Sequence, residues 1–183
     1  TAEENNITIR QPEKITIMET DALTELEPEI VVVVAYGLMR TKEFISVPKF
    51  GCINVHPSLL PRWRGAAPIQ RSIEYGDKLS GITIMKMEEK LDAGDIIYQE
   101  PIEIRDNDSS TSLHKKFIEI GTDSLLLTLD SIVENNFILH PQDESLATYA
   151  KKIKKEEAKI NWDNGAEKIH KKIMAFNSWP VAE

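Results

Sequence analysis

Apolar and polar positions follow two patterns along this 183-residue chain, one typical of buried strands and one typical of amphipathic helices. A continuous β-branched run, EIVVVVAY at Glu29 to Tyr36, shows no alternation, which predicts a strand buried on both faces in a parallel sheet. Residues 111–135 carry apolar side chains at helical spacing and predict the longest helix, although Gly121 inside it allows two shorter ones. Further strands are predicted at residues 7–9, 52–56, 81–87 and 96–104, and further helices at 21–26, 41–47, 66–75 and 167–176.

Glycine and proline mark the ends of several predicted elements. Gly76 is expected to stop the helix that begins at Ala66, because glycine adopts the left-handed conformation that often follows a helix. Pro101 inside the last predicted strand indicates an edge position or a bulge, since proline has no N–H to donate to a neighbouring strand. The order of the elements predicts an α/β fold with a mixed sheet and a helical tail.

Composition is typical of a globular domain and gives no membrane signal. Hydrophobic residues make up 41% and charged residues 28% of the chain. The longest apolar run, Ile30 to Tyr36, is far too short to span a bilayer, and the polar first residues do not resemble a secretory signal. A single cysteine, Cys52, excludes an internal disulfide framework and offers no metal cluster. We therefore expect a cytoplasmic protein, monomeric and without a metal.

Charge is distributed unevenly along the chain. The net charge of -8 argues, by itself, against a nucleic-acid partner. Residues 151–172, however, hold eight lysines and four acidic residues, so this segment carries +4 and the remainder about -12. On charge alone, the segment is interpreted as a solvated pair of amphipathic helices.

Asn54 and His56 stand at the end of a predicted strand, where open α/β sheets usually bind their ligands. Strand alternation places both side chains on one face of the sheet. An amide can donate to an oxygen on which negative charge develops, and an imidazole can move a proton at neutral pH. The pattern alone also fits a structural histidine whose hydrogen bonds are satisfied within the protein.

Asp92 follows Asn54 by 38 residues, in the glycine-containing loop LDAGD that precedes another predicted strand. A carboxylate there can orient His56 and stabilise its charged form, or it can simply be a turn residue. The sequence has no nucleophile-elbow motif and no glycine-rich phosphate loop. Direct group transfer without a covalent enzyme intermediate is therefore the simpler hypothesis.

Two segments resemble the methionyl-tRNA formyltransferase family of the 10-formyltetrahydrofolate-dependent formyltransferases. They are GCINVHPSLLPRWRGAAPIQRSI at residues 51–73 and KLDAGDIIYQ at residues 90–99. VVVVAYGL, TYAKKIKKEEAKINW and AFNSWP elsewhere in the chain fit as well. Sister enzymes that formylate other amines share Asn-x-His, Ser-Leu-Leu-Pro and the aspartate loop. The arginine-rich stretch from Arg62 to Gln70 and the lysine-rich tail are similar to the tRNA-formylating branch.

The resemblance implies formyl transfer from 10-formyltetrahydrofolate to the amino group of initiator methionyl-tRNA, with Asn54, His56 and Asp92 as catalytic residues. It implies a cis peptide bond between Leu60 and Pro61. The expected folate-binding residues are Tyr36, Gly37, Leu38, Ser58, Leu59, Leu60 and Pro61. The expected tRNA contacts are basic: Arg62, Arg64, Lys151, Lys152, Lys154 and Lys155.

The resemblance also implies a domain organisation. We expect a mainly parallel, Rossmann-like sheet flanked by helices in a catalytic domain at residues 1–140, without the family's N-terminal strand–helix unit. Residues 141–183 are expected to form a helical extension and linker toward a C-terminal β-barrel domain that is absent from this chain. Two alternatives stay open: formylation of another amine, such as glycinamide ribonucleotide or an amino sugar, and an inactive fragment that binds folate or tRNA.

Overall fold

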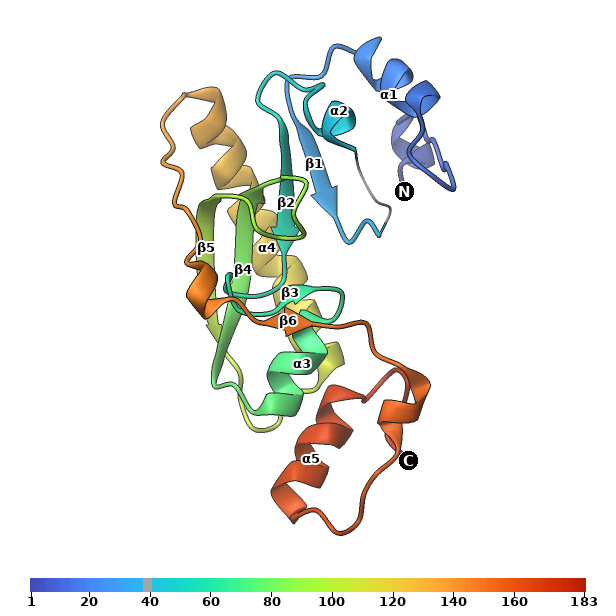
Figure 1. The fold of residues 1–183 in the computed structure, drawn as a ribbon, viewed down its shortest axis with the longest axis vertical. Coiled ribbons are helices and arrows are strands. Elements are labelled where there is room, and N and C mark those ends of the chain that lie inside the picture. Colours follow the sequence, from blue (N-terminus) through green and yellow to red (C-terminus); the bar gives the residue numbers. More distant parts are fainter. Residues whose placement is uncertain (38–40) are drawn as a thin grey trace.

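A four-stranded sheet organises the structure, a computed structural model that describes residues 1–37 and 41–183. Its strands are β1 (Val31–Val34), β2 (Cys52–His56), β4 (Leu79–Lys86) and β5 (Ile96–Glu103), in the spatial order β1-β2-β4-β5 (Figure 1). The pairing of β1 with β2 is parallel, whereas β2 with β4 and β4 with β5 are antiparallel. The predicted α/β class is confirmed, but the mainly parallel order extends only to the first pair, because β4 and β5 form a hairpin.

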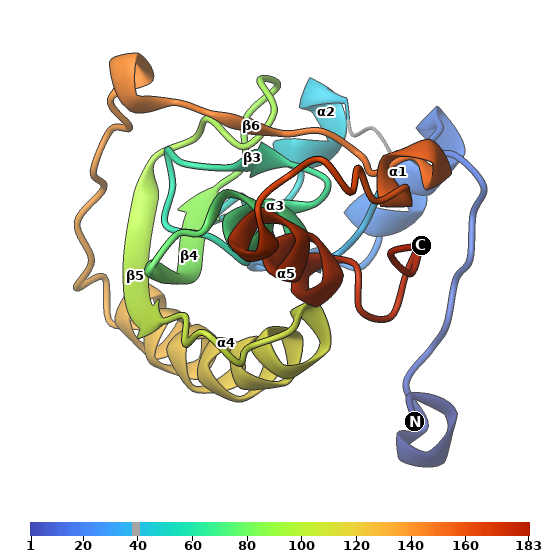
Figure 2. The same cartoon turned by 90° about the horizontal axis from the view of Figure 1, so that it is seen from below.

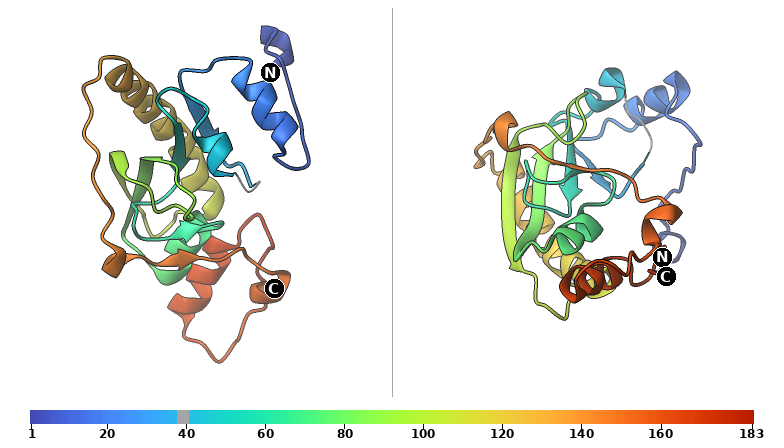
Figure 3. Two further views of the ribbon diagram at one scale, coloured as in Figure 1. Left: turned by 45° about the horizontal axis from the view of Figure 1, so that its top comes forward. Right: turned by 60° about the horizontal axis from the view of Figure 1, so that its bottom comes forward.

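The valine-rich strand β1 lies at one edge of this sheet. Val33 is 6% exposed, but Val32 and Val34 are 36% and 58% exposed, so the prediction of burial on both faces is wrong. Among the described residues, no strand pairs with the outer edge of β1. The helices α1 (Ile17–Thr24) and α2 (Lys42–Ile45) lie beside it, at the opposite side of the sheet from β5 (Figures 1 and 3).

One long helix, α4 (Ser110–Val133), covers one face of the sheet (Figure 2). A capping box between Ser109 and Ser112 starts it, and its apolar face buries Leu113 and Phe117 against the sheet. Each such side chain contributes about 1.5–3 kcal/mol of burial free energy. Gly121 does not divide the helix. A β-carbon there would lie 3.6–3.7 Å from Ile82 and Val55 on the sheet, so this glycine permits close packing.

The other face of the sheet is covered by the loop that follows β2. Within this loop, β3 (Arg64–Gly65) pairs in parallel with β6 (Tyr149–Ala150) from the C-terminal part of the chain. The helix α3 (Pro68–Tyr75) follows β3 and ends at Gly76, which adopts the predicted left-handed conformation with φ 75°. It packs against α5 (Ala166–Ala175), the helix predicted for the tail (Figure 2).

The remaining helical turns and the other predicted elements complete the fold. The short 3-10 helices are Glu3–Asn5, Glu144–Leu146 and Lys155–Ala158. Pro101 lies in the edge strand β5, as predicted, but residues 7–9 form no strand, since Ile7 and Ile9 are exposed and contribute nothing to the core. No helix within the described part of the chain is both long and apolar enough to cross a membrane. The domain boundary at residue 140 stays a prediction.

Candidate active site

Strand β2 places Asn54 and His56 together on the face of the sheet that α4 does not cover. Val55, between them, points the other way and packs toward α4 beside Gly121. Both polar side chains are enclosed, with Asn54 9% and His56 4% exposed. Among the described residues, nothing forms a hydrogen bond with the Asn54 side-chain amide. The strand-end pair predicted from the sequence therefore forms, with the amide available to a ligand.

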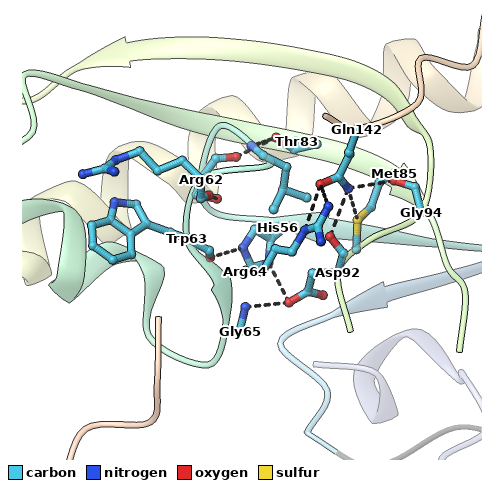
Figure 4. Close-up of polar contacts among 12 residues, drawn as sticks. His56, Arg62, Trp63, Arg64, Gly65, Thr83, Met85, Asp92, Gly94 and Gln142 are labelled. Carbon is cyan, nitrogen blue, oxygen red and sulfur yellow. Dashed lines mark hydrogen bonds and ion pairs between the residues drawn. The ribbon is translucent and has the colours of Figure 1, made fainter. Parts of the chain in front are cut away.

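The hydrogen bond of His56 fixes which ring nitrogen acts as the base. Its Nε2 lies 2.9 Å from the backbone carbonyl oxygen of Trp63. A carbonyl oxygen can only accept a hydrogen bond, so Nε2 carries the proton in the neutral ring and Nδ1 is left with its lone pair. Nδ1 faces Oδ2 of Asp92 at 3.8 Å (Figure 4). His56 is thus oriented by one backbone group and faces one carboxylate.

Burial decides the charge of His56. Burial lowers the pKa of its imidazole, and this effect outweighs the Asp92 carboxylate and the Trp63 carbonyl, which both raise the pKa. The sequence-based expectation that Asp92 keeps the ring charged is therefore wrong for this state of the site. A neutral His56 can accept a proton at Nδ1, and Asp92 is placed to stabilise the cation that results.

Asp92 reaches the site through an unusual backbone conformation. Its φ is 47°, in the left-handed region, where a non-glycine residue stores about 1 kcal/mol or more. The Gly65 N–H donates to its Oδ2 at 2.8 Å, and the Gln142 side chain donates to its backbone oxygen at 3.0 Å. Aspartate and asparagine tolerate this conformation better than most residues. The loop thus brings Asp92 beside His56, as predicted.

Hydrogen bonds to the sheet fix the shape of the loop at residues 57–62. The Thr83 hydroxyl donates to the Ser58 carbonyl at 2.6 Å and accepts the Leu60 N–H at 3.1 Å. Gln99 donates to the Leu60 carbonyl at 3.0 Å. The peptide bond between Leu60 and Pro61 is cis, which confirms that prediction.

The residues predicted to bind folate differ in exposure. Ser58 and Leu60 are buried, and the Ser58 hydroxyl donates to the Arg62 carbonyl, so both shape the loop from within. Leu59 and Pro61 are half-buried, and Tyr36 and Gly37 are exposed just beyond β1. Leu38 lies outside the described residues. Their role in folate binding stays a prediction.

The predicted tRNA contacts fall into two groups. Arg64 is fully buried and donates to Gln142 and Glu144, so its prediction as a surface contact is wrong. Arg62 is exposed and forms a bidentate pair with Asp77 at 2.7 and 2.8 Å. The four predicted lysines are all exposed: Lys151, Lys152, Lys154 and Lys155.

Sequence reasoning missed the residues that support this site. Thr83 and Gln99 hold the loop after β2, and Thr148 accepts the Trp63 N–H at 2.9 Å through its hydroxyl oxygen. Gln142 links Arg64 to the Asp92 loop. Only Thr83 carried a usable signal, since strand alternation places it on the face that carries His56, its partner in the β2–β4 register. Within the described ranges, no group of three or more histidine, cysteine or acidic residues is placed to hold a metal ion.

Comparisons with known proteins agree with this geometry. The methionyl-tRNA formyltransferase of Methylococcus capsulatus is 46% identical over 165 residues, which cover 90% of this chain and 54% of that protein. The chain therefore spans about half the length of this relative. The structure of HypX from Aquifex aeolicus in complex with tetrahydrofolic acid has a TM-score of 0.77 at 21% identity, covering 89% of this chain and 28% of HypX.

The N-formyltransferase of Helicobacter canadensis, solved with folinic acid and dTDP-3-aminofucose, also has a TM-score of 0.77, at 24% identity over 96% of this chain and 62% of that one. Residues 2–129 match the sequence model described as formyl transferase, and residues 152–183 match the formyl transferase C-terminal domain. The first match covers well over half of the chain and includes Asn54, His56 and Asp92. The chain belongs to the formyl transferase family.

Proposed function

We propose that this chain transfers a formyl group from 10-formyltetrahydrofolate to the α-amino group of initiator methionyl-tRNA. One observation carries the chemistry: an unpartnered Asn54 amide lies beside His56, whose Nδ1 faces Asp92 at 3.8 Å. The 46% identity to a methionyl-tRNA formyltransferase supports the acceptor. A monomeric state and a cytoplasmic location stay predictions.

The residues present fit a folate co-substrate. The Asn54 amide is 9% exposed and has no hydrogen-bond partner among the described residues, and an enclosed polar group of this kind favours a polar ligand. Tyr36, Gly37, Leu59 and Pro61 offer accessible surface nearby to hold the ligand. HypX and the Helicobacter canadensis enzyme were solved with tetrahydrofolic acid and folinic acid, which supports a folate here. The folate supplies the formyl group.

The three polar residues divide the work of transfer. The Asn54 amide donates a hydrogen bond to the formyl oxygen, on which negative charge develops. His56 accepts a proton from the attacking amine at Nδ1, since its Nε2–H is held by the Trp63 carbonyl. Asp92 stabilises the imidazolium so formed, which burial would otherwise disfavour.

The lysine-rich segment supports tRNA as the acceptor. Its four exposed lysines form a local positive surface on a chain of net negative charge. Phosphate contacts depend on such local charge and weaken as salt rises. Changing all four to glutamine should raise the Kd for tRNA and flatten its salt dependence by up to about 0.9 per lost contact. A control that changes the exposed Lys14, Lys42, Lys49 and Lys115 instead alters the net charge equally and should leave both unchanged.

Single-turnover formyl transfer to methionyl-tRNA tests the chemistry. Asn54→Ala, His56→Ala and Asp92→Asn should each slow the chemical step by at least about 100-fold. His114→Ala and Asp123→Asn, at exposed positions of α4, are matched controls and should keep the rate of the unchanged chain. Near-normal rates for all three site variants would refute the assignment.

A second acceptor class is favoured by one finding. The Helicobacter canadensis enzyme was solved with an amino-sugar nucleotide, and its fold matches this chain. Offering charged initiator tRNA, dTDP-3-aminofucose and glycinamide ribonucleotide in competition separates these functions. Exclusive formylation of the sugar or of the ribonucleotide would overturn tRNA as the acceptor, and folate binding without any turnover would identify an inactive fragment.

A further inference from the structure

Arg64 is a buried cation next to the candidate active site. Its side chain is 0% exposed, and its Nε and Nη2 donate to Oε1 of Gln142 at 3.1 and 2.8 Å. Nη2 also donates to Glu144 at 2.9 Å. Enclosing a guanidinium is costly unless its partners are precisely placed. Gln142 is therefore the partner that enters the interior to meet Arg64.

The opposite end of the Gln142 side chain holds the Asp92 loop. Its Nε2 donates to the backbone oxygens of Asp92 at 3.0 Å and Gly94 at 2.8 Å (Figure 4). The orientation of the amide follows from these partners, because a guanidinium can only donate and a carbonyl can only accept. Both Nε2 hydrogens and the Oε1 acceptor are thus in use at once.

The loop held by Gln142 needs external support. Asp92 has a φ of 47°, and a β-carbon at Gly94 would lie 2.0 Å from the Lys86 carbonyl oxygen, so the turn is strained and tightly packed. Adjacent residues of β3 grip Asp92 at two points. Gly65 donates to its carboxylate directly, and Arg64 acts on its backbone through Gln142.

We propose that Gln142 is a positioning residue, which holds the Asp92 carboxylate against His56 by joining the buried Arg64 guanidinium to the backbone of the Asp92 loop. The proposal deepens the formyl-transfer function proposed above and rests on it. Gln142 touches neither His56 nor Asn54, so it acts through Asp92. Its contribution should appear in the chemical step rather than in substrate binding.

Two substitutions separate this role from simple neutralisation of Arg64. Gln142→Glu keeps an acceptor for Arg64 and adds charge complementarity, but removes both donors to the loop. Gln142→Leu removes both functions. If Gln142 only satisfies Arg64, the glutamate variant is fully active, whereas positioning predicts that both variants fail. Gln11→Glu and Gln11→Leu, at an exposed position, are the matched controls.

Steady-state formyl transfer gives the first readout. Both Gln142 variants should lower kcat by about 100-fold, the scale of a misplaced catalytic group, with KM for the amine changed less than about threefold. Combining Gln142→Leu with Asp92→Asn should slow the reaction no more than Asp92→Asn alone, because both act on one interaction. Wild-type kcat in Gln142→Glu, or losses that add in the double variant, would overturn the proposal.

Histidine NMR gives a second readout that needs no turnover. Asp92 is the charged group that acts on His56 within the described part of the chain, and the Trp63 carbonyl is the polar one. Displacing Asp92 in Gln142→Leu should therefore lower the pKa of His56, as Asp92→Asn does. An unchanged pKa in Gln142→Leu would refute positioning even if the unchanged chain proved inactive in formyl transfer, so the two proposals fail separately. If Gln142→Leu does not fold, the rate of Gln142→Glu decides.

Discussion

Asp92→Asn is the substitution that isolates charge from shape in this site. Asparagine has nearly the same size, retains an oxygen that accepts the Gly65 N–H, and tolerates the left-handed conformation that Asp92 adopts at φ 47°. The backbone of the loop and the Gln142 contacts should therefore persist. What is lost is the negative charge 3.8 Å from Nδ1 of His56.

The separation of the two groups sets the size of the effect. Opposite charges 3.8 Å apart attract by about 4 kcal/mol at an effective dielectric constant of about 20, a value suited to sites of this kind. Asp92 is 12% exposed, so water weakens this attraction and the figure is an upper bound. At 1.36 kcal/mol per decade, loss of the charge should slow a step that forms the imidazolium by about 10² to 10³-fold.

Single-turnover formyl transfer between pH 5 and 9 measures this effect, with equilibrium folate binding as the reference. The rate should fall by the stated factor while folate affinity stays within about threefold. Because Asp92 raises the pKa of His56, its removal should also move the acid limb of the kcat/KM profile to lower pH. A rate within tenfold of the unchanged chain would show that no imidazolium forms beside Asp92, and the mechanism would be wrong.

Three further outcomes are expected. Gly94→Ala should lower the free energy of unfolding by about 1–3 kcal/mol in urea titrations, because its methyl group would overlap a backbone carbonyl oxygen, whereas Gly165→Ala, which meets no neighbour, should be nearly neutral. Stability should decline as pH falls below about 6.5, since the unfolded chain protonates His56 while burial keeps its folded pKa lower, and His56→Gln should flatten this decline in pH-dependent unfolding. The hydrogen bond from Arg64 lowers the pKa of Glu144 to about 2, so its carboxyl ¹³C signal should titrate near pH 2, and its stabilising effect should be complete above about 4.5.

These outcomes have clear contradictions. Equal stability of the two glycine variants would mean that the Asp92 loop relaxes freely. A Glu144 signal that titrates near 4.5 would show that the ion pair with Arg64 does not form in solution. A His56→Gln chain with the same acid profile as the unchanged protein would assign the acid sensitivity to other groups.

Local patterns predicted the scaffold of this site well. Strand alternation placed Asn54 and His56 on one face, and the helix before Gly76 ends where the glycine predicts. The same reasoning failed for β1, where Val32 and Val34 are exposed. A run of valines reports that a strand can be buried on both faces, but the number of neighbours around that strand is a property of the assembled sheet.

Charge reasoning failed at Arg64 for a related reason. Its place in an arginine-rich loop suggested a surface contact, yet pairing of β3 with β6 encloses it and gives it Gln142 and Glu144 as partners. Those partners lie about 80 residues further along the chain. No local pattern at residues 62–65 announces them.

The sequence by itself determined the identities and local conformations of the reacting groups: an amide and an imidazole one pleat apart on β2, a tight loop around Asp92, and a cis bond before Pro61. These follow from short-range steric and hydrogen-bonding preferences. Only the tertiary structure decided that Asp92 faces Nδ1 of His56, that burial lowers the pKa of that ring, and that Gln142 supports the loop. Such features depend on which distant segments share one interior, because hydrogen bonds and desolvation act between neighbours in space.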